Sequence, residues 1–290
     1  MEKLRIITDS ASDISAADEQ RLNIGMLPFQ VVLGGRSYTS RVDFDNEGFY
    51  ALMAQHDEVP LTSQINPFEF VQLYLQHAQA GYTELILVLI NSEGSATWQN
   101  SVQAIELFYE EYPQYRGSLR IRSFDSRGYS LLYGAPVLEA ARRCAAGESA
   151  DSICAYLEQT LPRRQVYFGM YTLRYAGRSG RIPSAAAFLG DKLNLKPVMK
   201  IFDHEIVTAA KCRGEARLLP RIAEMTLAAM EPGTPYDIVY GDDSVCRDAL
   251  AEQMTALTGY PPTGFFQIGA AVAANAGPRV AGTGFLRRAD

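Results

Sequence analysis

Hydroxyl side chains cluster in two short segments of this 290-residue chain, and such clusters can bind an anion. The segment Asn91-Ser-Glu-Gly-Ser-Ala-Thr97 offers three hydroxyls around Gly94, whereas capping a helix needs only one. Thr62 and Ser63 form a second pair shortly before Pro67, a residue suited to the first turn of a helix. Together these groups could hold a carboxylate or phosphate by neutral donors, without a permanently charged lysine or arginine.

Carboxyl groups stand in two similar loops, at Asp9 and Asp13 and again at Asp125. The spacing of the first two fits neither a tight metal-binding pair nor a calcium loop. We interpret Asp9 as ending a strand by accepting hydrogen bonds from loop amides, and Asp125 in the same way. Ser12, Asp13 or Ser15 is then the cap of the helix that follows Asp9. The alternative is an enzyme, a hydrolase or phosphotransferase acting on a small carboxylate or phosphoester, with Ser95 as nucleophile or Asp9 as base.

The three histidines give that alternative little support. His56 and His77 fall in or beside surface-type helices and His204 in a turn, so we interpret all three as solvated. The hydroxyl loops then have no histidine or lysine partner, and neither a catalytic residue nor a metal site is predicted. A sensor for a polar metabolite is a third interpretation.

Strands and helices alternate through the first half, which predicts a parallel sheet whose carboxyl ends bring these loops together. The expected strands are Leu4–Ile7, Gly25–Leu33, Glu84–Ile90 and Arg120–Phe124, and the expected helices are Ser12–Arg21, Phe44–Ala54, Pro67–Ala80, Thr97–Tyr109, Tyr129–Ala146 and Ala150–Thr160. Thr62–Pro67 is expected to be a loop.

The pattern changes after Pro162. The expected strands are Gln165–Tyr171, Asp237–Tyr240, Phe265–Ala271 and a hairpin of Pro197–Phe202 with Glu205–Thr208; the expected helices are Ser184–Leu193, Leu218–Met230 and Val245–Thr258. Tyr175–Pro183 is expected to be a loop and Asn275–Gly284 a turn. We therefore predict an α/β protein: a parallel-sheet N-terminal domain (residues 1–161) with helices on both faces, carrying the hydroxyl loops, and a smaller mixed α/β C-terminal domain (residues 162–290) covering a pocket.

Composition excludes several classes of protein. A net charge of −6 and a pI near 5.3 argue against a nucleic-acid partner. No apolar run is long enough for a transmembrane segment and the N-terminus has no signal-peptide pattern. The four cysteines are far apart without a CxxC pair, so we expect reduced thiols and a cytoplasmic location.

Five segments, in order along nearly the whole chain, resemble the DegV family of bacterial fatty-acid-binding proteins. They are Ile6-Ile-Thr-Asp-Ser-Ala-Ser-Asp-Ile14, Thr62-Ser-Gln-Ile-Asn-Pro67, Ser92-Glu-Gly-Ser-Ala-Thr-Trp-Gln99, Asp125-Ser126 with Ser130, and Gly180-Arg-Ile182 followed by Leu189-Gly190 and Leu193-Asn-Leu-Lys-Pro197. Single segments are weak evidence, but the ordered set is specific.

The resemblance implies two α/β domains that hold one long-chain fatty acid, with no catalysis and no cofactor. It also implies a partner, a separate ATP-dependent fatty acid kinase that converts the bound carboxylate to an acyl-phosphate for phospholipid synthesis. Thr62 and Ser95, with Ser63 beside them, match carboxylate-binding positions. Arg181 and Arg213 match basic positions associated with headgroup contact or kinase docking.

The chain departs from the family pattern at two places near the expected carboxylate. Asn275 stands where the family commonly has a histidine, and asparagine can donate a hydrogen bond but cannot carry charge. Gly94, Ala96 and Trp98 replace the usual leucine, glycine and tyrosine, which could reshape the entrance to the site. We expect Asn275 to contact the carboxylate and a fatty acid to remain the favoured ligand.

Overall fold

Four parallel strands form the first sheet of the computed structural model, which describes residues 3–182 and 194–289. In spatial order they are β2 (Gly25–Leu27), β1 (Leu4–Asp9), β6 (Glu84–Leu89) and β7 (Arg120–Asp125). Every residue of β6 is buried, as its continuous apolar run predicted. Because the strands run in one direction, the loops that follow β1, β6 and β7 meet at one edge of the sheet.

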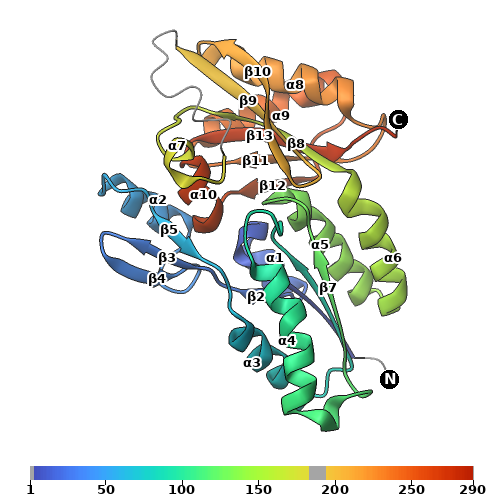
Figure 1. The fold of residues 1–290 in the computed structure, drawn as a ribbon. Helices are drawn as coiled ribbons and strands as arrows, with labels where there is room; N and C mark the ends of the chain where they lie inside the picture. Colours follow the sequence, from blue (N-terminus) through green and yellow to red (C-terminus); the bar gives the residue numbers. More distant parts are fainter. Residues whose placement is uncertain (1–2, 183–193, 290) are drawn as a thin grey trace.

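Helices cover both faces of this sheet, as predicted (Figure 1). α3 packs with α4 on one side, and α5 packs with α6 on the other. The helices of this half are α1 (Ala16–Arg21), α2 (Asn46–Ala54), α3 (Pro67–Gln79), α4 (Thr97–Glu111), α5 (Leu131–Ala145) and α6 (Ala150–Thr160). Ser15 caps α1, because its side chain accepts a hydrogen bond from the Asp18 amide. None of the helices in the described ranges is long and apolar enough to cross a bilayer.

A small antiparallel sheet corrects two expectations. It consists of β4 (Arg36–Thr39), β3 (Gln30–Leu33) and β5 (Leu61–Ser63). The single strand expected over residues 25–33 is therefore two strands in different sheets, since Pro28 has no N–H to continue a ladder. The loop expected at 62–67 begins as a strand in which Thr62 pairs with Val31. The pairing of β5 with β3 fixes the backbone of the Thr62–Ser63 pair.

The second half forms a six-stranded mixed sheet, in the order β10-β9-β8-β13-β11-β12. Its strands are β8 (Arg164–Met170), β9 (Leu195–Phe202), β10 (Glu205–Arg213), β11 (Tyr236–Tyr240), β12 (Gly264–Gln267) and β13 (Val280–Leu286). The hairpin that turns at Asp203 and His204 is confirmed, and both of its strands are longer than expected.

The last part of the chain differs most from the expectation. The strand expected through Ala271 ends at Gln267, and an alanine-rich helix, α10 (Ala270–Ala276), follows it. The turn expected over residues 275–284 overlaps β13, which lies between β8 and β11. The strand β13 was not predicted because it contains glycines, and glycine is uncommon in strands. The glycines are required by packing: a Cβ on Gly284 would lie 1.8 Å from Leu131 Cδ1.

The remaining described elements are three helices of the second half and four short 3-10 helices, of which η1 and η2 belong to the first half. They are α7 (Ala176–Ser179), α8 (Leu218–Ala229), α9 (Ser244–Thr258) and the 3-10 helices η1 (Ser10–Ser12), η2 (Pro113–Tyr115), η3 (Leu161–Arg163) and η5 (Glu215–Arg217). α7 lies in the expected loop 175–183, and the helix expected at 184–193 falls outside the described residues. The chain passes from one half to the other at η3, while the division into domains at 161/162 stays a prediction.

Candidate ligand-binding site

A cavity of about 380 Å³ lies between the two halves of the molecule. Its walls come from the loops after β6 and β7, from β5, from the mixed sheet and from α10. Most of the lining is apolar: Phe29, Ile90, Leu131, Val166, Phe168, Ile182, Ile201, Ile206, Val239, Ile268, Ala271, Val272, Ala276 and Val280. The cavity therefore suits a ligand with a substantial hydrocarbon part.

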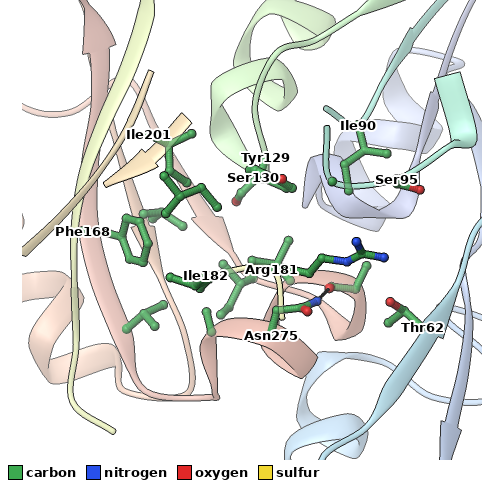
Figure 2. A pocket seen from close by; sticks show the side chains of 18 of the residues that line it. Thr62, Ile90, Ser95, Tyr129, Ser130, Phe168, Arg181, Ile182, Ile201 and Asn275 are labelled. Carbon is green, nitrogen blue, oxygen red and sulfur yellow. Dashed lines mark hydrogen bonds between the residues drawn. The ribbon is translucent and has the colours of Figure 1, made fainter. Parts of the chain in front are cut away.

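Polar side chains line the cavity as well, and several of them gather in one part of it. Figure 2 shows the Arg181 guanidinium in the same part of the view as Ser95, Thr62 and Asn275, away from the apolar Phe168. Thr62, Ser63 and Arg181 are also exposed to solvent. The pocket is thus amphipathic, with a polar part open to the surface. The structure brings together all four residues predicted to bind a carboxylate, and their role in binding stays a prediction.

Ser95 is positioned by the turn between β6 and α4. The amides of Gly94 and Ser95 both donate to the Asn91 carbonyl, at 3.0 and 3.1 Å. Ser95 Oγ accepts from the Thr97 amide at 3.3 Å and lies 2.9 Å from Thr97 Oγ1. Thr97 Oγ1 in turn accepts from the amide of Ile65 at 3.2 Å, which ties this turn to the segment after Ser63. The Thr97 hydroxyl therefore has a structural role, whereas Ser95 lines the cavity.

Arg181 changes the expected electrostatics of the pocket. The hydroxyl loops alone suggested neutral donors, yet the structure adds a guanidinium to the wall beside them. Within residues 3–182 and 194–289, no carboxylate forms an ion pair with this guanidinium. An arginine in a pocket without an acidic partner is suited to bind an anion. Arg213 lies elsewhere, exposed at the end of β10 and outside the cavity wall.

Asn275 lies on α10 rather than in a turn, and its amide is partly committed to its own helix. Asn275 Nδ2 donates to the Ala271 carbonyl at 2.9 Å. One amide hydrogen and the carbonyl oxygen remain for a ligand.

The loop carboxylates that invited a catalytic interpretation are scaffolding. Asp9 accepts hydrogen bonds from the amides of Ala11 and Ile90 and from the Tyr133 hydroxyl, so its oxygens are occupied. Burial raises the pKa of Asp9 to about 6, and these hydrogen bonds limit the rise. Asp125 Oδ1 accepts from the Ser92 amide in the neighbouring loop. The interpretation of both as loop acceptors is confirmed.

Asp13 connects the first loop to α10 and does not cap α1. Its Oδ1 accepts from the Gly269 amide at 2.7 Å, and Gly269 is the N-cap residue of α10. Burial raises the pKa of Asp13 to about 7, although the Ser130 side chain and the Gly269 amide act to lower it. Neither Asp13 Oδ2 nor Ser130 Oγ has a partner in hydrogen-bond geometry among the described residues.

The interpretation of His204 as solvated is wrong. The hairpin β9–β10 reaches the loops of the parallel sheet, so that His204 Nδ1 lies 2.7 Å from Asn91 Oδ1 and 3.9 Å from Asp125 Oδ2. The hydroxyl loop therefore has a histidine neighbour, which only the tertiary structure supplies. Among the described residues the ring forms a hydrogen bond with Asn91 and none with Ser95, and His204 is not part of the cavity wall. Anywhere within residues 3–182 and 194–289, no group of three or more histidine, cysteine or acidic side chains could hold a metal ion.

Several polar pocket residues were missed from the sequence, among them Gln64 after the Thr62–Ser63 pair and Tyr129 and Ser130 in the loop after β7. Ser130 was matched to a family segment without a role. Tyr129 carried one signal that could have identified it, the glycine at position 94. A Cβ on Gly94 would lie 2.1 Å from the Tyr129 hydroxyl oxygen, so this glycine makes room for the phenol.

A family model described as an uncharacterised protein of the DegV family matches residues 3–288. The chain belongs to the DegV family. A DegV domain-containing protein from Clostridium perfringens is 30% identical to it over 289 residues, which cover 97% of this chain and 98% of the relative.

Solved structures of similar proteins have the same fold. A fatty-acid-binding DegV family protein from Thermus thermophilus is 26% identical, with a TM-score of 0.83 over 99% of this chain and 100% of that one. A stearic-acid-binding protein from Eubacterium ventriosum is 20% identical, with a TM-score of 0.87 over 99% and 98% of the two chains, and it shows the fold alone.

Proposed function

We propose that this DegV family protein binds a long-chain fatty acid and presents it to a separate ATP-dependent kinase. The observation that carries the proposal is the amphipathic cavity, in which the hydroxyl loops and Arg181, which has no carboxylate partner within residues 3–182 and 194–289, adjoin an apolar wall. Burying an alkyl chain contributes about 0.8 kcal/mol per methylene, so the apolar wall supplies affinity. The polar groups prevent an unpaired buried charge and orient the ligand.

A similar protein of known structure supports a fatty acid as the ligand. The Thermus thermophilus neighbour is a fatty-acid-binding member of the same family and shares 26% of its residues with this chain. In our proposal the carboxylate contacts Ser95, Thr62, Ser63 and Arg181, with Asn275 nearby, and the hydrocarbon tail lies among the apolar side chains of the cavity.

Exposure of the polar part supports presentation to a second protein. Thr62, Ser63 and Arg181 are exposed, so a carboxylate held there is within reach of a protein docked over the opening. The kinase would transfer a phosphoryl group to this carboxylate and form an acyl-phosphate for phospholipid synthesis. In this proposal the protein itself performs no catalysis, has no cofactor and acts in the bacterial cytoplasm.

Identification of the natural ligand tests the proposal. The purified protein is denatured and extracted with solvent, and the released molecules are identified by mass spectrometry. We expect one fatty acid per chain. A polar metabolite in its place, or turnover of ester substrates by the pure protein, contradicts the proposal and favours the sensor or the enzyme.

The variant Ser95→Ala tests the polar contacts. We expect it to bind a fatty acid about tenfold more weakly, because a hydrogen bond to a charged group is lost. Ser118→Ala, an exposed serine outside the cavity wall, is the matched control. Unchanged affinity in Ser95→Ala would mean that this loop does not hold the carboxylate.

A further inference from the structure

The Tyr129 hydroxyl accepts a hydrogen bond, and within residues 3–182 and 194–289 it donates none. Asn91 Nδ2 donates to the Tyr129 hydroxyl oxygen at 3.1 Å. The orientation of this amide follows from its other contacts, since Asn91 Oδ1 accepts from the Glu93 amide at 3.1 Å and Nδ2 also donates to the His204 carbonyl at 3.0 Å. The Tyr129 oxygen is therefore the acceptor in this contact. No described residue accepts the phenolic proton.

The position of this hydroxyl is fixed from two sides. Its oxygen lies against Gly94, next to Ser95 in the chain, where any side chain would collide with it. Tyr129 and Ser95 both line the cavity. In the view of Figure 2, Tyr129 lies between the apolar side chains of Phe168 and Ile201 and the polar group around Ser95 and Arg181.

Burial keeps the Tyr129 phenol protonated, and the positive charge of Arg181 also acts on it. Burial is the largest influence on its pKa and raises it above the ordinary value of 10, while the charge of Arg181 opposes the rise. The hydroxyl is therefore a donor at neutral pH, close enough to Arg181 to sense its charge. A neutral donor beside a guanidinium favours a ligand with a negatively charged oxygen.

We propose that Tyr129 donates a hydrogen bond to the carboxylate of the ligand and that Gly94 is required because it lets the phenol reach this position. The inference rests on the proposed function, since it assigns one more contact in the same site. It also addresses the loss of the family histidine, because Asn275 directs an amide hydrogen to Ala271 and cannot carry charge. Tyr129 makes the pocket select a free acid over an uncharged ligand with the same tail.

Tyr129→Phe tests the donor, because it keeps the ring and removes only the hydroxyl. Affinities for oleic acid and for oleyl alcohol are measured by displacement of a fluorescent fatty acid. We expect the Kd for oleic acid to rise by about tenfold or more and that for oleyl alcohol by less than about threefold, since only the acid presents a charged acceptor. Tyr115→Phe, which removes a phenol hydroxyl far from the cavity wall, is the matched control and should change neither value.

Gly94→Ala is a second variant that keeps the tyrosine and displaces its hydroxyl. We expect the same loss of selectivity for the acid. The inference is overturned if Tyr129→Phe loses equal affinity for oleic acid and oleyl alcohol, or loses affinity for neither. In that case the proposed function still stands as long as the wild-type protein binds oleic acid. If the wild-type protein binds no fatty acid, both fail together.

Discussion

The buried carboxyl of Asp13 makes a quantitative prediction about stability and pH. Asp13 is 6% exposed and lies where the first loop meets Gly269 at the start of α10. Burial raises its pKa from 3.8 to about 7; the nearby charge of Asp9 adds to the rise, and Arg41, Ser130 and the Gly269 amide oppose it. In the unfolded chain this carboxyl ionises near 3.8, without that penalty. The folded protein therefore loses stability relative to the unfolded chain as pH rises toward and through 7.

The size of this loss follows from the two pKa values. Each unit of pKa difference corresponds to about 1.4 kcal/mol, so Asp13 lowers the free energy of unfolding by about 2–3 kcal/mol between about pH 5 and pH 8. Asp9, with a pKa raised to about 6, acts in the same direction and contributes about 1 kcal/mol over that interval. Asp13→Asn keeps an acceptor for the Gly269 amide and removes the ionisation. The free energy of unfolding of this variant should therefore fall by about 2–3 kcal/mol less than that of the wild type between about pH 5 and pH 8.

Urea unfolding followed by circular dichroism at several pH values between about 5 and 8 measures this difference. Asp57→Asn, which removes one charge from a fully exposed side chain, is the control and should follow the wild type. The burial of His77 lowers its pKa and affects wild type and variant alike, so it cancels in the comparison. If the stability of Asp13→Asn falls as steeply with pH as that of the wild type, the assigned role of this carboxyl is refuted.

Two further predictions concern the two parts of the pocket. Arg181→Gln should weaken fatty-acid binding by about tenfold to a hundredfold, because it removes a charged donor, whereas Arg213→Gln should not change affinity in a calorimetric titration. Equal effects of the two substitutions would exclude Arg181 as a headgroup contact. Ala271→Phe places a ring inside the apolar wall and should lower affinity for oleic acid much more than for octanoic acid. Ala17→Phe on the exposed surface of α1 is its control, and equal losses for both acids would show that the tail does not reach Ala271.

Much of the first half could be predicted from the sequence because its signals are local. The apolar run of β6, the proline and asparagine at the start of α3 and the serine cap of α6 each specify their element with neighbouring residues. The hydroxyl loops follow strands of one parallel sheet, so their meeting at one edge also follows from the strand pattern.

The second half was harder because its signals are packing contacts rather than propensities. β13 contains Gly282 and Gly284, whose small size is explained only by the backbone of Tyr167 and the side chain of Leu131 pressed against them. Gly269, the N-cap residue of α10, donates its amide hydrogen bond to Asp13, which lies 256 residues earlier in the chain. No window of the sequence contains both members of such a pair.

The candidate site divides in the same way. Ser95, Thr62 and Ser63 could be recognised as candidate anion-binding residues from the sequence alone, because a hydroxyl loop needs no distant partner to be recognised. The family resemblance singled out both Arg181 and Arg213, and the folded chain places only Arg181 in the cavity wall. The contact of His204 with Asn91 and the packing of Tyr129 against Gly94 are seen only once the chain has folded. A side chain has the same hydrogen-bond donors and acceptors wherever it lies, so these can be read from the residue type. The charges and free donors that surround a ligand depend instead on which distant segments of the chain fold around the site.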